Sequence, residues 1–169
     1  MKTLRTLYTI MLLALMPTLA AQATRYYVKA DGTGTAAGTS WDDAMTLQTA
    51  LNNAKAGDEI WMMGYEAISK DNVYRTPGVD GFTLKSGVRL YGGFSGTEQA
   101  IDDREIIDGK AYRMKYRTVL TGDIGRNDTV DATNLIFPAN TTRTDNATHV
   151  LTLNMTPTEA SGNKNTQST

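Results

Sequence analysis

A short basic segment, residues 110–117, holds the side chains best suited to bind a charged ligand. In an extended chain alternate residues share a face, so the cations of this segment would lie opposite its tyrosine and methionine side chains. A guanidinium binds a carboxylate through two parallel hydrogen bonds, and a polysaccharide lyase needs a cation to neutralise its substrate's carboxylate. A solvated basic strand face is the alternative interpretation. The predicted ligand surface, for uronates or sulfates, consists of Arg113, Lys115 and Arg117.

Three aspartates, Asp71, Asp102 and Asp131, are spaced 31 and 29 residues apart. If the chain repeats with that period, they could stack on one face, where mutual repulsion raises the pKa of a carboxyl group or attracts Ca²⁺. Glycosidases also need two carboxylates at about 5.5 to 9.5 Å. The alternative is that all three are solvated turn residues.

Other familiar site patterns are incomplete. The chain has no cysteine and a single histidine, His149, so it lacks the further ligands of a zinc site and the further residues of a catalytic triad. We therefore expect His149 to be structural. The segment from Asp123 to Asp128 lacks the spacing of an EF-hand loop, and the Gly-rich residues 31–40 depart by one residue from the dinucleotide fingerprint. We therefore expect no catalytic residue, metal or cofactor site.

The first 23 residues have the pattern of a secretory signal peptide. Lys2 and Arg5 precede a mostly apolar stretch, residues 7–19, and Ala21-Gln22-Ala23 forms a small-x-small cleavage site. A membrane anchor is the rival interpretation, but the apolar stretch is shorter than the ~20 residues that span a bilayer. We expect an exported chain, extracellular or on the outer surface of a bacterium, because an exported protein without disulfides is typical of a bacterial envelope. The net charge of −1 argues against a nucleic-acid partner.

The start of the mature chain, residues 24–57, predicts a strand followed by a helix. Residues 25–29 include two tyrosines and a valine, aromatic and β-branched residues that favour a strand. Apolar residues then recur at helical spacing between a Thr46 N-cap and a Gly57 stop. The apolar positions of this helix are Leu47, Ala50, Leu51 and Ala54.

Residues 58–155 contain short apolar centres at a regular spacing. The centres begin at Ile60, Val88, Val119 and Val150, which are 28, 31 and 31 residues apart. Such a period is typical of solenoids, and the scarcity of helix predicts a β-solenoid whose strands pair in parallel. The helix over residues 46–54 would cap its first coil, and the polar residues 156–169 would form a low-complexity tail.

Six short motifs carry a family resemblance, at residues 27–34, 38–44, 47–51, 57–61, 90–98 and 119–124. They resemble motifs of secreted bacterial right-handed parallel β-helix proteins of the pectate-lyase-like superfamily, and they are similar to those of polymorphic outer membrane proteins. This resemblance implies an all-β fold, a short right-handed parallel β-helix with an N-terminal capping helix. Because members usually continue with more coils, it also implies that the chain is a fragment of a longer protein.

Two function classes follow from these observations. The first is a secreted or cell-surface module that binds polysaccharide or a cell-surface protein, as an adhesin does, without catalysis. The second is a polysaccharide lyase or glycoside hydrolase. An enzyme would need a convergent cluster of charged residues, whereas the sequence offers isolated candidates, so we expect the binding module.

Overall fold

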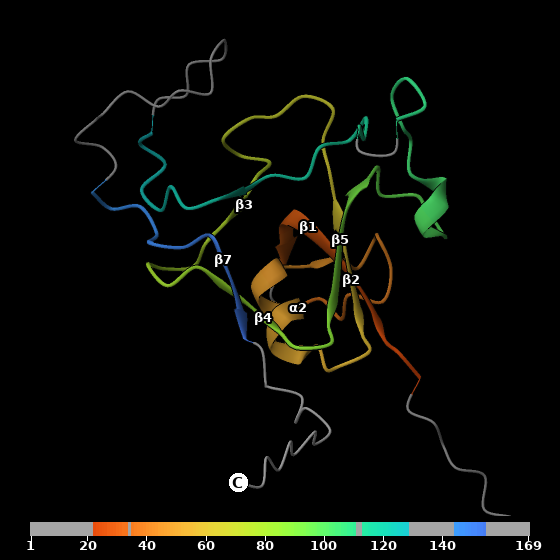
Figure 1. Cartoon of the computed structure of the whole chain (residues 1–169), viewed down its shortest axis with the longest axis horizontal. Coiled ribbons are helices and arrows are strands. Elements are labelled where there is room, and N and C mark those ends of the chain that lie inside the picture. The colour runs from red at the N-terminus through yellow and green to blue at the C-terminus, as the bar shows by residue number, and fades with distance from the viewer. Residues whose placement is uncertain (1–21, 34, 111–112, 129–143, 155–169) are drawn as a thin grey trace, which may run out of the picture.

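A computed structural model describes residues 22–33, 35–110, 113–128 and 144–154 (Figure 1). The predicted signal peptide, residues 1–23, lies almost wholly outside the described residues, and the predicted tail, residues 156–169, lies entirely outside them. Within the described ranges, no helix has the length and apolar character needed to cross a membrane.

The strands form three small parallel sheets. The largest has the order β1-β2-β5, and each of the others has two strands, β3 with β6 and β4 with β7. One helix, α2, packs against β1, β4 and β2. The bounds are β1 Arg25–Thr33, α2 Leu47–Asn53, β2 Glu59–Met63, β3 Tyr74–Arg75, β4 Phe82–Lys85, β5 Arg89–Phe94, η1 Ile101–Asp103, β6 Leu120–Thr121 and β7 Leu151–Asn154.

Strand β2 lies at the centre and is buried on both faces. Its alternating side chains point to opposite sides, as the pleat of a strand requires. Ile60 and Met62 enter the larger core, which α2 covers, while Trp61 enters a second cluster with Trp41 and Phe94. Figure 1 shows β1, β2 and β5 together in the middle of the molecule, and in the sheet β2 pairs with both of the others.

Helix α2 begins where the sequence predicts. The Thr46 side chain accepts a hydrogen bond from the backbone N–H of Thr49, which confirms the predicted N-cap. Leu47, Ala50 and Leu51 are buried, as their helical spacing indicates. The helix ends at Asn53, before Gly57, because Ala54 adopts an extended conformation with φ −62° and ψ 144°.

The prediction of an all-β, short right-handed parallel β-helix is wrong. The described residues form one helix and short strands in small parallel sheets, without a solenoid or a closed sheet. The predicted coil region, residues 58–155, contributes strands to all three sheets rather than one continuous ladder.

The error arose from the way the apolar centres pair. The first two meet as expected, since Ile60 is in register with Leu90. The third does not continue this ladder, because Leu120 pairs with Tyr74 of β3. The fourth pairs elsewhere again, with Leu151 in register with Phe82 of β4. Strands β3 and β4 carry no strong sequence pattern, so the regular spacing of the centres does not reveal that the third and fourth centres pair with these strands.

Asp58 fixes the start of the central sheet. Its Oδ1 accepts a hydrogen bond from Thr24 N at 2.8 Å and its Oδ2 accepts one from Lys55 N at 2.8 Å. The side chain is buried, and these hydrogen bonds, Lys55 foremost, hold its pKa below the usual range against the opposing effect of burial. The carboxylate thereby joins the start of β1 to the turn that precedes β2.

We predict that Asp58→Asn lowers the free energy of unfolding at pH 7, because an amide offers one acceptor oxygen where two N–H groups need partners. The folded pKa of Asp58 is lowered, so its stabilisation is present above about pH 4, near the unfolded pKa, and is lost as the pH falls through the folded value. Urea unfolding of wild type and variant, at pH 7 and at steps below about pH 5, measures both effects.

Asp42→Asn is the matched control, since Asp42 is exposed. It should change neither the stability at pH 7 nor the acid dependence. Equal acid dependence in wild type and Asp58→Asn would contradict the role of the carboxylate.

Candidate functional site

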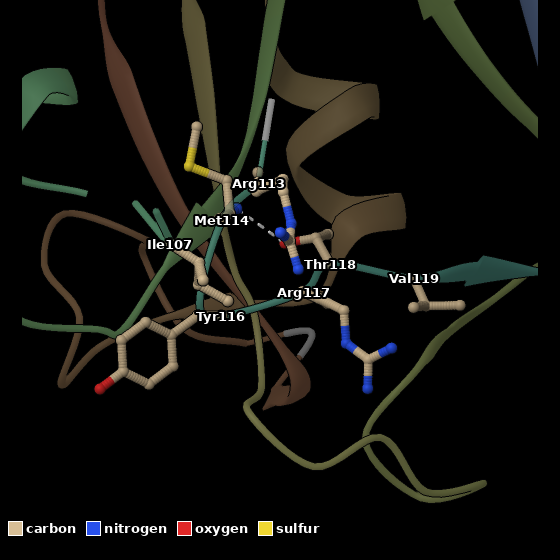
Figure 2. Close-up of a pocket in the computed structure, with 9 residues that line it drawn as sticks. Ile107, Arg113, Met114, Tyr116, Arg117, Thr118 and Val119 are labelled. Atoms are coloured by element: carbon tan, nitrogen blue, oxygen red, sulfur yellow. Dashed lines mark hydrogen bonds between the residues drawn. The ribbon is translucent and has the colours of Figure 1, made fainter. Parts of the chain in front are cut away.

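An open hollow of about 550 Å³ lies beside the C-terminal half of β5 (Figure 2). It is built from the end of β5, from Ile107 and from residues between Arg113 and Val119. Two of the three predicted ligand residues, Arg113 and Arg117, line it, and Lys115 does not. The lining residues are Gly92, Gly93, Ile107, Arg113, Met114, Tyr116, Arg117, Thr118 and Val119.

A turn at Asp108 and Gly109 brings Arg113 to the hollow. Lys110 N donates to Ile107 O at 3.2 Å, and the central residues have φ 57° and 64°, the left-handed values that a type I′ turn requires. Beyond the turn, Ile107 N donates to Arg113 O at 2.7 Å and Lys115 N donates to Glu105 O at 2.9 Å. Asp-Gly is a strong hairpin signal, a local sequence cue that the expectation of an extended segment over residues 110–117 does not include.

The floor of the hollow is a β-bulge of two glycines. The register of β2 and β5 runs from Trp61 opposite Tyr91 to Met63 opposite Phe94, so Gly92 and Gly93 together face one residue of β2. The bulge turns Gly93 N toward Thr118, whose Oγ1 accepts a hydrogen bond at 2.9 Å, drawn dashed in Figure 2.

Both positions need glycine because neighbouring side chains lie where a Cβ atom would be. A Cβ at Gly92 would lie 2.8 Å from the Thr118 side chain, and one at Gly93 would lie 2.7 Å from Cγ of Met114. Gly93 also has φ 90°, where L-residues are strained. The bulge therefore lets the lining segment pack directly on the sheet.

The backbone of Arg117 is held from the other side. Arg117 N donates to Tyr65 O and Tyr65 N donates to Arg117 O, both at 2.9 Å. Gly64, which precedes Tyr65, has no side chain, and a Cβ there would collide with Tyr116 O. These contacts fix the position from which the arginine side chain extends.

The three predicted ligand cations differ in their partners. Arg113 Nη1 pairs with Asp108 Oδ2 at 2.7 Å, and Lys115 Nζ pairs with the two Glu105 oxygens at 3.0 and 3.1 Å. The hydrogen bond to Glu105 raises the pKa of Lys115. Within the described ranges, the guanidinium of Arg117 has no ion pair or hydrogen bond. Arg117 is therefore the cation that is available to an anionic ligand.

The predicted alternation of faces along this segment does not occur. Met114 and Tyr116 line the same hollow as the two arginines, because the segment makes only single bridges, at Met114 and Arg117, and bends between them. Tyr112 lies outside the described residues.

The other candidates do not converge on this hollow. Asp71 pairs with Arg126 at 3.4 Å, Asp102 lies in η1, and Asp131 is outside the described residues. Among the residues that the structure describes, no group of three or more potential ligands could hold a metal ion. His149 is exposed ahead of β7.

Comparison with protein-family models, with curated proteins and with solved structures gives no match. The resemblance to the pectate-lyase-like superfamily thus remains an observation on sequence motifs, and the function must be inferred from the hollow itself.

We predict that Gly93→Ala destabilises the protein by about 1–3 kcal/mol, through the strained φ and the contact with Met114. Gly109→Ala is the control, because Gly109 also has positive φ, 64°, but a Cβ there meets nothing within 4 Å. Chemical denaturation should show the larger loss for Gly93→Ala. A loss no larger than that of Gly109→Ala would contradict the packing role of the bulge.

Proposed function

We propose that the chain is an exported or cell-surface module that binds acidic polysaccharide, without catalysis, in the hollow beside β5. The observation that carries this proposal is the guanidinium of Arg117, which has no partner among the described residues and lines an open hollow together with Arg113.

The chemistry of the hollow suits a uronate or sulfate group. A guanidinium forms two parallel hydrogen bonds with a carboxylate, and such charge-assisted bonds are stronger than neutral ones. Among the described residues Arg117 has no partner to give up, whereas Arg113 would exchange Asp108 for the ligand. Because Asp108 neutralises the charge of Arg113, Arg117 makes the direct contact.

The remaining walls favour a sugar over a free ion. Tyr116, Met114 and Ile107 line the hollow, and Ile107 is exposed although it is apolar. Binding sites combine such apolar surface with a few polar groups that orient the ligand. The apolar C–H faces of a sugar ring match this surface, and the openness of the hollow leaves room for a chain that continues on both sides.

We predict that Arg117→Ala weakens the binding of polygalacturonate, alginate or chondroitin sulfate at least about tenfold, because a charged hydrogen-bond pair contributes about 1.5–3 kcal/mol. Isothermal titration calorimetry with each polymer gives the affinities. Binding by the wild type should also weaken as salt rises, since the pairing is exposed to solvent.

Arg126→Ala is the matched control, because Arg126 is an exposed arginine that pairs with Asp71 outside the hollow. It should bind as the wild type does. Equal losses in the two variants would indicate diffuse charge attraction and contradict a site at Arg117. Incubation with the same polymers, followed by absorbance of unsaturated products, tests for lyase activity, and activity lost in Arg113→Ala would contradict a purely binding role.

A further inference from the structure

Strand β7 (Leu151–Asn154) is an open edge of its sheet. It pairs with β4 on one side, and among the described residues no strand pairs with its other side. All four of its residues are exposed, with Leu151 at 37% and Leu153 at 59%. Figure 1 shows β7, in blue, at the end of the described chain.

Two residues of β7 have backbone groups that are not bonded to β4. Phe82 N donates to Val150 O at 2.9 Å, and Ser86 N donates to Asn154 O at 3.0 Å. In a parallel ladder alternate residues face the partner strand, so the N–H and C=O groups of Leu151 and Leu153 point away from β4. These are the groups through which another strand can be added to a sheet.

The side chains of the same two residues extend the core face. Leu151 is in register with Phe82, which is 2% exposed, and Leu153 is in register with Leu84, which packs against the larger core. Neighbouring residues in register share a face of the sheet. The two leucines thus present apolar surface where the core continues and no element of the described chain covers it.

Strand β4 is also tied to the end of α2. Lys85 Nζ donates to Asn52 O at 2.6 Å and to Ala54 O at 3.1 Å. A pairing of β7 with β7 about a two-fold axis uses the same edge of both copies, so such an assembly closes instead of forming a fibre.

The composition of β7 favours a second copy of this chain as the partner. Its residues, Leu-Thr-Leu-Asn, carry no charge, proline or bulge, the devices by which edge strands avoid pairing with copies of themselves. A second copy meets the strand without charge repulsion, and a two-fold axis satisfies the open groups of both copies at once.

We propose that two copies of this chain pair through β7. The strands run antiparallel about a two-fold axis, which joins the sheets into one of four strands, β4-β7-β7-β4. Leu151 and Leu153 of each copy then lie beside those of the other on one face, and cross-strand contacts between them stabilise the pair.

Sedimentation velocity of the full chain over a range of concentrations tests this pairing. The wild type should shift from monomer to dimer as concentration rises. Leu153→Lys should weaken dimerisation at least about tenfold, because a lysine on an edge strand opposes pairing. Leu153→Pro should do the same, since it removes an N–H that points away from β4 and leaves the bonds to β4 intact.

Val79→Lys is the matched control, because Val79 is 58% exposed and lies outside the strands. It should dimerise as the wild type does, and circular dichroism should show that all variants remain folded. A wild type that stays monomeric at every concentration, one that forms assemblies larger than a dimer, or a Val79→Lys variant that loses dimerisation would each overturn the proposal.

Discussion

The exclusion of water from both faces of β2 is the constraint on which the rest of the structure depends. Each fully buried large side chain contributes roughly 1.5–3 kcal/mol, and β2 buries Ile60 and Met62 on one side and Trp61 on the other. A strand buried in this way needs partners at both edges, because its backbone groups cannot reach water. Strands β1 and β5 meet that need by pairing in parallel with the two edges of β2.

The hollow depends on the same strand. The pairing of β2 with β5 shifts by one residue between Trp61 and Met63, and the β-bulge at Gly92 and Gly93 takes up this shift. The bulge provides a surface on which Met114 and Thr118 pack. The basic residues are thus presented by a segment that is fixed at its glycine contacts and at Tyr65. A cation anchored in this way loses less conformational freedom on binding than one on a free loop.

Features with a local cause could be predicted from the sequence, and features of long-range pairing could not. The Thr46 cap and the buried centre at Ile60 follow from side-chain type and spacing. The partners of the later strands do not, because β3 and β4 are short and their pairing joins residues far apart in the chain. The basic residues could be named, but their common hollow depends on the turn at Asp108 and on the glycine bulge.

The aromatic cluster beside β2 also governs the optical properties of the protein. Trp41 and Trp61 are the only tryptophans in the sequence, and both lie in this cluster, where Trp61 stacks on Phe94 with ring centroids 4.4 Å apart. The guanidinium of Arg25 lies 3.6 Å from the centre of the Trp61 ring. Tryptophan fluorescence therefore reports on one side of the sheet alone. The larger core, which contains no tryptophan, can loosen without a tryptophan signal of its own.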